Sequence, residues 1–218
     1  MSGAGGMCRA KTELRWMRFV DGENFVHQGS KFLAKRFNRT PELGIVSPFF
    51  KKDHFLWLPT QGWCAGTNYH LAAQWASARN ENNQTPEAIR AYYYTVVSGA
   101  REEVIPITEK MIWSIGFTPR IIWKEKAKKK SKAVDSSLSV DMLSAAYENQ
   151  FDLVEIWTGD ADYIPLISAV KRLGKVVVCC FFEEEYGLSN ELKVACDRYC
   201  DISELVEQRW KADLTTMK

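Results

Sequence analysis

The chain has 218 residues, of which 46% are apolar, and its formal net charge is only +2. This length and composition are enough to bury one large α/β core, while the near-neutral charge excludes recognition of a polyanion by bulk charge alone. No apolar run approaches the ~20 residues that span a bilayer, so no membrane association is expected. The six cysteines are scattered, which favours a reducing, cytoplasmic compartment over a disulfide framework.

Strand-like and helix-like segments alternate along most of the sequence. Strands are expected at residues 14–20, 91–97, 119–123, 152–158, 175–182 and 199–202. Helices are expected at about 25–37, 107–115, 138–145, 164–173 and 188–196. This alternation predicts an α/β fold, a three-layer α/β/α sandwich with a mainly parallel central sheet.

One stretch interrupts the alternation of strands and helices, and we interpret it as an insertion within a single domain. We expect a flexible N-terminal lead-in at 1–13, one domain at 14–211 with an insertion at about 39–86, and a C-terminal tail at 212–218. The insertion is rich in proline, glycine and aromatic residues, without clear periodicity. Three interpretations remain open: a lid on the core, a surface for a homodimer, or a platform on which bases stack.

Aspartates follow several of the expected strands. Asp21 ends the first strand, Asp160 and Asp162 follow the strand at 152–158, and Asp135 opens the helix after the third strand. Because the carboxyl ends of parallel strands share one edge of a sheet, these four side chains are expected to converge. Carboxylates that lie close together repel each other unless a cation is bound. Mg²⁺ or Mn²⁺ suits an all-oxygen site, and such ions activate water and stabilise phosphate oxygens.

Several of these residues also have structural explanations. Asp135 suits a helix N-cap, Asp162 can cap the helix after its turn, and Asn24 can cap the first helix. Asp141 falls in mid-helix beside the apolar stripe, where an unpaired acid is costly to bury. A partner arginine, exposure at the margin of the stripe, or a bound cation would each account for Asp141.

Lysines are concentrated in one short segment. Six of them fall within nine residues, namely Lys124, Lys126, Lys128, Lys129, Lys130 and Lys132. A local basic block in a near-neutral protein can be a binding surface for a polyanion, or simply a solvated loop. Both interpretations remain open.

These stretches resemble the NYN domain family, and specifically the LabA-like branch of the PIN-like nucleases. The resemblance rests on residues 19–24, 132–135, 141–143, 157–167, 173–178 and 188–197. It covers most of residues 15–205 outside the insertion. The chain departs from the family pattern at Ala133, where glycine is usual, and in the length of the insertion.

The resemblance implies a PIN-like fold and a Mg²⁺- or Mn²⁺-dependent endoribonuclease. It implies that the catalytic metal ligands are Asp21, Asp135, Asp160 and Asp162, with Asp141 as a further candidate. Asn24 would position the first loop, and Thr158 would contact a phosphate or another ligand.

Two functions are weighed from the sequence. The first is a nuclease that hydrolyses phosphodiester bonds of single-stranded RNA, whose backbone the lysine block and Arg120 would hold. The second is a non-catalytic module of the same fold that binds RNA or a protein partner. A phosphatase of the haloacid-dehalogenase type fits less well, because it requires Asp-x-Asp at the first strand, where this chain has Glu23 and Asn24.

Overall fold

This computed structural model describes residues 15–37, 88–114, 116–124, 132–183, 186–204 and 206–207. The insertion, the lead-in and the tail expected from the sequence lie outside the described residues. Within the described ranges, no helix is long and apolar enough to cross a membrane.

One parallel sheet forms the centre of the described structure. Its strands lie in the order β3-β2-β1-β4-β5-β6, and every neighbouring pair is parallel. The strands are β1 (Trp16–Asp21), β2 (Arg90–Ser98), β3 (Thr118–Lys124), β4 (Leu153–Trp157), β5 (Val176–Phe181) and β6 (Arg198–Asp201). The prediction of a mainly parallel sheet is therefore confirmed.

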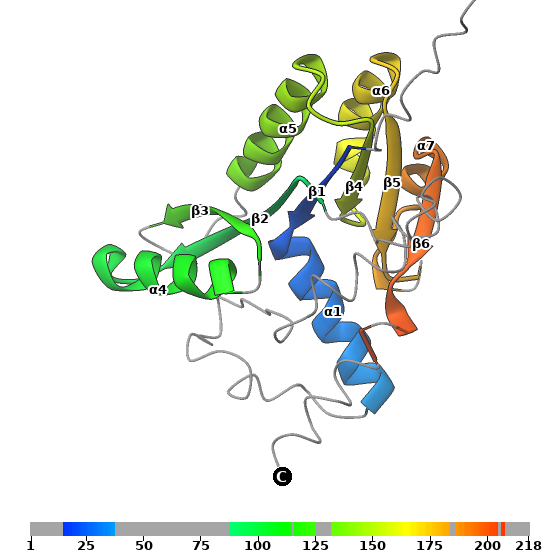
Figure 1. The fold of residues 1–218 in the computed structure, drawn as a ribbon. Helices are drawn as coiled ribbons and strands as arrows, with labels where there is room; N and C mark the ends of the chain where they lie inside the picture. Colours follow the sequence, from blue (N-terminus) through cyan, green and yellow to red (C-terminus); the bar gives the residue numbers. More distant parts are fainter. Residues whose placement is uncertain are drawn as a thin grey trace, which may run out of the picture.

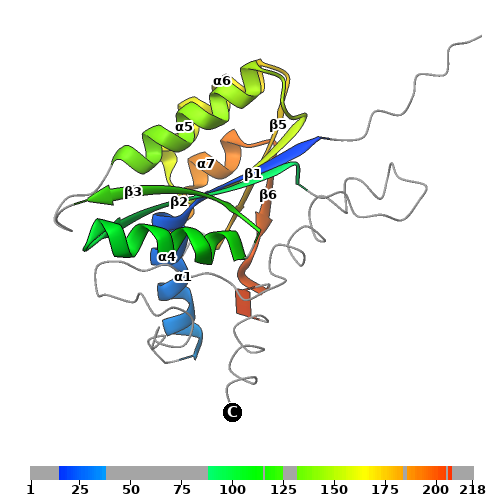
Figure 2. The same cartoon turned by 60° about the vertical axis from the view of Figure 1, so that its left-hand side comes forward.

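Helices cover both faces of this sheet (Figures 1 and 2). They are α1 (Gly22–Phe37), α4 (Arg101–Ser114), α5 (Lys132–Tyr147), the 3₁₀ helix η2 (Ala161–Tyr163), α6 (Ile164–Arg172) and α7 (Asn190–Ala195). In Figure 2, α1 and α4 lie below the sheet, and α5, α6 and α7 lie above it. The expected three-layer sandwich is confirmed.

The order of the strands reverses between β1 and β4. The chain moves outward from β1 through β2 to β3, and α5 then carries it back across the opposite face to β4. Open α/β sheets bind ligands at the carboxyl ends of the strands that flank such a reversal. In this protein those strand ends carry Asp21 and the loop that begins at Thr158.

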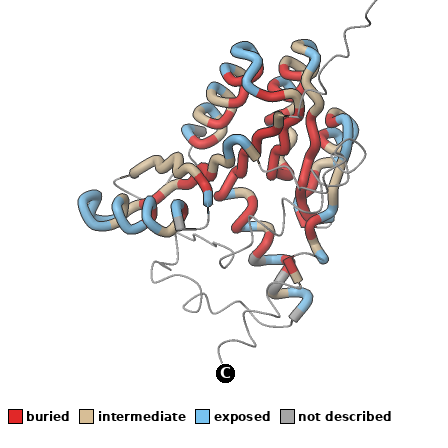
Figure 3. The backbone as a smooth tube through the Cα atoms, viewed as in Figure 1, coloured by how far each residue is buried: buried red, intermediate tan, exposed pale blue. Residues whose placement is uncertain are grey.

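The two central strands are buried along their whole length. Every residue of β1 and β4 is buried, and the tube in Figure 3 is red through both strands. Strands covered on both faces normally read as continuous apolar runs. Arg18 and Glu155 break this rule, because both are charged and both are fully buried.

Arg18 and Glu155 form an ion pair inside the core. They are partners in the register of β1 and β4, and Nε of Arg18 lies 2.7 Å from Oε2 of Glu155. The Arg18 guanidinium carbon lies 5.1 Å from the ring centre of Trp16 and 5.0 Å from that of Trp157. The two indoles exclude water, so each charge depends on the other for compensation.

Three helices begin earlier than the sequence predicts, among them α5, which begins at Lys132, six residues before its expected start. Helix α1 begins at Gly22, three residues before its expected start, and α4 begins at Arg101, six residues before its expected start. Helix α4 contains Pro106, which cannot donate a backbone hydrogen bond. Pro106 and Glu102 are both exposed, so water can satisfy the carbonyl group that the proline leaves unbonded.

We predict that Arg18→Met destabilises the protein by about 3–5 kcal/mol, because the Glu155 carboxylate would remain buried without its cation. The double variant Arg18→Met, Glu155→Leu should recover most of this loss, since both charges are then removed. The measurement is the free energy of unfolding in urea at neutral pH.

The matched control is Arg36→Met. Arg36 pairs with Glu207, and the arginine side chain is 60% exposed, so its loss should cost at most about 1 kcal/mol. An equal loss of stability in Arg18→Met and Arg36→Met would contradict the prediction.

Candidate functional site

Asp21 joins the end of β1 to the start of α1. Its Oδ1 accepts a hydrogen bond from the backbone N–H of Asn24 at 3.1 Å. Asn24 is the third residue of α1, so Asp21 is the N-cap of this helix, and the prediction that Asn24 is the cap is wrong. The next residue must be glycine, because a Cβ on Gly22 would lie 2.4 Å from the carbonyl oxygen of Tyr94.

The other carboxylate oxygen of Asp21 accepts two hydroxyl groups. Oγ1 of Thr158 and the hydroxyl of Tyr163 each lie 3.3 Å from Oδ2. Asp21 is only 3% exposed. The pKa of the Asp21 carboxyl is raised to about 7, chiefly by burial and also by the charge of Asp135, although the hydrogen bonds from Asn24, Thr158 and Tyr163 act in the opposite direction.

Tyr163 links Asp21 to Asp135. Its hydroxyl lies 3.1 Å from Oδ1 of Asp135, in addition to its contact with Asp21. Burial, followed by the negative charges of Asp21 and Asp135, raises the pKa of Tyr163, so the hydroxyl keeps its proton. One proton is therefore placed between two carboxylates. The sequence assigned no role to Tyr163, and its only signal there is its position next to Asp162.

Asp135 lies in the first turn of α5. This helix begins at Lys132, so the prediction that Asp135 is its N-cap is wrong. A carboxylate in the first turn still faces the positive end of the helix dipole. The structure thus brings Asp21 and Asp135 together from two elements that meet at the carboxyl edge of the sheet.

The loop after β4 carries the other two predicted acids. Oγ1 of Thr158 accepts a hydrogen bond from the backbone N–H of Asp160 at 3.2 Å. Oδ1 of Asp160 accepts one from the N–H of Asp162 at 3.0 Å and caps η2. The N-cap of α6 is Tyr163, which makes no side-chain capping hydrogen bond, so the prediction that Asp162 caps this helix is wrong. Thr158 connects this loop directly to Asp21.

Asn24 and Gly159 hold the same loop against α1. Oδ1 of Asn24 accepts a hydrogen bond from the backbone N–H of Gly159 at 3.0 Å. A Cβ on Gly159 would lie 2.2 Å from the carbonyl oxygen of Gly187 and 2.5 Å from the ring of Phe181. Only glycine allows this close approach. The first turn of α1 and the loop after β4 therefore form one connected unit around Asp21.

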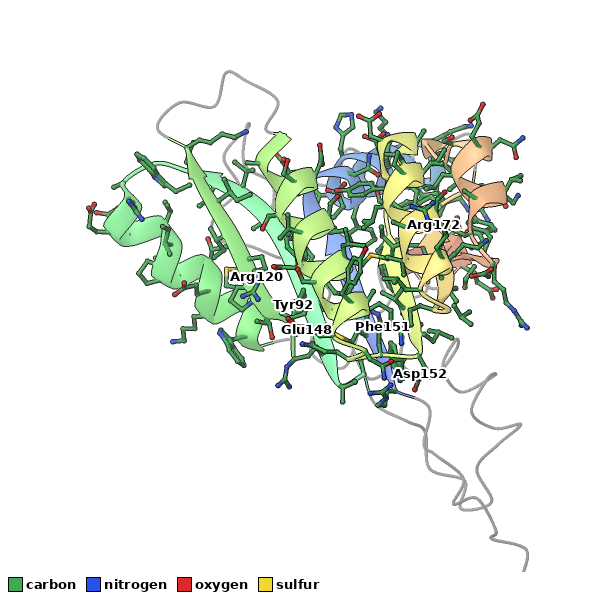
Figure 4. All side chains as sticks on the ribbon, turned by 90° about the horizontal axis from the view of Figure 1, so that it is seen from above. Tyr92, Arg120, Glu148, Phe151, Asp152 and Arg172 are labelled. Atoms are coloured by element: carbon green, nitrogen blue, oxygen red, sulfur yellow. The ribbon has the colours of Figure 1, made fainter. Side chains whose placement is uncertain are left out.

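Asp141 has a cation from the chain itself. Its Oδ2 accepts hydrogen bonds from Nε of Arg120 at 2.9 Å and from the hydroxyl of Tyr94 at 2.8 Å. The Arg120 guanidinium lies over the ring of Tyr92, 4.7 Å from its centre, and the two side chains lie side by side in Figure 4. This is the partner arginine that the sequence left open. Metal binding by Asp141 and RNA binding by Arg120 stay predictions.

Only the ends of the lysine block belong to described elements. Lys124 ends β3 and Lys132 begins α5. The intervening Lys126, Lys128, Lys129 and Lys130 lie outside the described residues. Both ends lie at the same edge of the sheet as the acids.

Glu23 is a further acid at this edge. Partial burial of the carboxyl raises its pKa, Lys124 lowers it, and the charge of Asp135 raises it. Glu23 is thus close enough to both Lys124 and Asp135 to sense their charges. The sequence did not assign it to the site, because one acid in the first turn of a helix is common.

Asp160 and Asp162 do not join Asp21 and Asp135 in a single group. Across the described ranges, no three Asp, Glu, His or Cys side chains form a group that could hold a metal ion. The two pairs of acids are instead connected by hydrogen bonds through Thr158. Metal binding by the four aspartates stays a prediction.

The pair formed by Asp21 and Asp135 fits a divalent cation by its chemistry. Both residues offer carboxylate oxygens, and each negative charge adds to the electrostatic cost of the other. Mg²⁺ commonly keeps several waters and uses only one or two protein carboxylates together with substrate phosphates. Asp21 and Asp135 are the residues that would hold such an ion.

Family comparison identifies the domain. The model of the NYN domain family matches residues 16–204. The chain belongs to the NYN domain family. NYN domains are generally nucleases of the PIN-like kind, and membership therefore supports a nuclease function.

A solved structure shares the fold of this NYN domain. It is a protein of unknown function from Vibrio parahaemolyticus, with a TM-score of 0.53 and 14% sequence identity. The alignment covers 89% of this chain and 96% of the other. At this identity the similarity shows the fold alone. A search of curated proteins gave no match.

The pKa of Asp21 predicts how stability depends on pH. Because burial raises the pKa from an ordinary 3.8 to about 7, the folded NYN domain retains a proton that the unfolded chain releases between these values. The stabilisation from this proton is complete below pH 4 and is lost as the pH rises through 7. Without added metal, Asp21 should therefore lower the free energy of unfolding by on the order of 3 kcal/mol between pH 5 and pH 8.

Asp21→Asn should remove this part of the pH dependence, because the amide has the same shape and does not ionise. The variant should gain stability over the wild-type protein as the pH rises from 5 to 8. Urea unfolding in EDTA at both pH values measures the difference. If the variant and the wild-type protein lost stability in parallel, Asp21 would not be the titrating group.

Proposed function

We propose that this protein is a Mg²⁺- or Mn²⁺-dependent endoribonuclease that hydrolyses phosphodiester bonds in single-stranded RNA. One observation supports the proposal above all others. A buried carboxylate, Asp21, and a second carboxylate, Asp135, share one tyrosine hydroxyl at the point where the strand order reverses. Among the described hydrogen bonds and ion pairs, none joins an arginine or a lysine to Asp21 or Asp135.

A divalent cation held there would supply Lewis acidity, stabilising charge on the phosphate oxygens and favouring ionisation of the attacking water. Asp21 and Asp135 would bind the ion, and Thr158 and Asn24 keep the loop of Asp160 beside them. In the reaction, an oxygen of water bonds to phosphorus and the bond from phosphorus to the leaving oxygen breaks. The water loses a proton, and the leaving oxygen gains one.

The lysine block would hold the RNA backbone. Lys124 and Lys132 flank the block, and both belong to elements that reach the acidic edge. Contacts between lysines and phosphates give salt-dependent binding with little sequence preference. Arg120 is already paired with Asp141, so it would contribute less to RNA binding than the lysines would.

We predict that the protein cuts labelled single-stranded RNA in the presence of Mn²⁺ and that EDTA stops the reaction. The physical reason is that the two neighbouring carboxylates cannot stabilise a phosphorane-like charge without a cation. Cleavage is measured by gel electrophoresis, with a DNA strand of the same sequence in parallel. Cleavage that continues in EDTA would rule out dependence on a divalent cation.

A second prediction concerns Asp160→Asn, which should abolish cleavage while leaving the fold intact. Asparagine caps helices about as well as aspartate, so η2 should still form, but the negative charge is lost. Circular dichroism and RNA cleavage rates measure the two outcomes separately.

Asp201→Asn is the matched control. Asp201 also accepts a hydrogen bond from the N–H two residues later, that of Ser203, but it lies at the end of the edge strand β6. This variant should cut RNA at the wild-type rate. Wild-type activity in Asp160→Asn would remove Asp160 from the proposed site.

A non-catalytic module that binds RNA or a protein partner is the second candidate. The role of Asp160 as a helix cap favours it, because capping alone explains that acid without any catalytic role. Retention of RNA without Mn²⁺-dependent cutting would support this second function.

A further inference from the structure

We propose that Tyr163 is a positioning residue whose hydroxyl fixes Asp21 and Asp135 in the arrangement that binds the divalent cation. This inference rests on the proposed function and deepens it. It assigns a role to a residue that is 1% exposed and whose hydroxyl contacts no acceptor other than these two carboxylates in the described structure.

The hydroxyl contacts one oxygen of each acid. It lies 3.3 Å from Oδ2 of Asp21 and 3.1 Å from Oδ1 of Asp135. Asp21 comes from the end of β1, Asp135 from α5, and Tyr163 from η2, so these contacts connect three separate elements. A single donor therefore sets the spacing of two acids that would otherwise repel each other.

The contacts leave other oxygens available. Within the described residues, no hydrogen bond reaches Oδ2 of Asp135, and Oδ1 of Asp21 accepts only the N–H of Asn24. A carboxylate oxygen has two lone pairs, so both atoms can still coordinate a cation. The hydroxyl can thus remain in place when an ion binds, as outer hydrogen-bond donors to metal ligands usually do.

The ring and the hydroxyl of Tyr163 can be separated by experiment. The ring packs in the apolar core, and phenylalanine would keep that packing. Tyr163→Phe removes only the hydroxyl. A purely structural role would then change the stability of the domain, but it would leave the affinity for Mn²⁺ unchanged.

Tyr199→Phe is a matched control. The Tyr199 hydroxyl also contacts two oxygens, the carbonyl groups of Phe181 and Phe182, at 3.1 Å and 2.9 Å. It touches neither carboxylate. Both variants therefore remove one hydroxyl that has two acceptors, and only one of them alters the proposed site.

The experiment titrates Mn²⁺ into the full chain, first freed of metal with EDTA, and follows binding by calorimetry for the wild-type protein and both variants. Tyr163→Phe should weaken Mn²⁺ binding by about tenfold or more, in line with the loss of other outer donors. Tyr199→Phe should bind as the wild-type protein does. RNA cleavage by Tyr163→Phe should recover as the Mn²⁺ concentration rises, while its KM for RNA at saturating Mn²⁺ stays at the wild-type value.

Each result decides the inference. Unchanged Mn²⁺ affinity in Tyr163→Phe would overturn it, and tighter binding would also overturn it, because the hydroxyl would then compete with the ion. If the wild-type protein binds Mn²⁺ but does not cut RNA, the proposed nuclease function is refuted. The Mn²⁺ titration of Tyr163→Phe would still decide whether Tyr163 positions the two acids. Absence of any Mn²⁺ binding to the wild-type protein would overturn both.

Discussion

The burial of the Asp21 carboxylate is the constraint on which the geometry of this edge depends. The same side chain caps α1, accepts a hydroxyl from the loop after β4, and accepts another from η2. These contacts satisfy its oxygens but do not neutralise its charge, and burial therefore raises its pKa to about 7. The helix, the loop and the 3₁₀ helix are arranged around a group that would be more stable with a cation beside it.

The two faces of the central strands differ in how their buried charges are paired. On the face that packs against α1, Arg18 and Glu155 neutralise each other between two indole rings. On the face that carries α5, Asp21 and Asp135 are both acidic and share only a neutral hydroxyl. Because side chains alternate along a strand, Arg18 and Asp21, which lie three positions apart in β1, face opposite sides of the sheet.

The alternation of strands and helices was sufficient to predict the parallel three-layer fold, and the rule for strand ends was sufficient to bring Asp21 and Asp135 together. Local details were not predictable. Helix α5 begins at Lys132 rather than at Asp135, because the cap depends on where tertiary packing allows the helix to start. The bridging role of Tyr163 was missed for a related reason. An aromatic residue after an acidic turn predicts core packing, and its hydroxyl acquires two acceptors only once three elements meet.

Asp141 and Asp135 lie on the same helix, but their negative charges are balanced in different ways. Asp141 receives a guanidinium from Arg120 and a hydroxyl from Tyr94, so its charge is balanced by the chain. Asp135 receives a hydroxyl alone from the described side chains. Packing that delivers an arginine to one acid of α5 shows that the fold can supply a cation on this face. None of the described ion pairs reaches Asp21 or Asp135, so the chain balances the charge of Asp141 and supplies no basic side chain to the other two acids in the described structure.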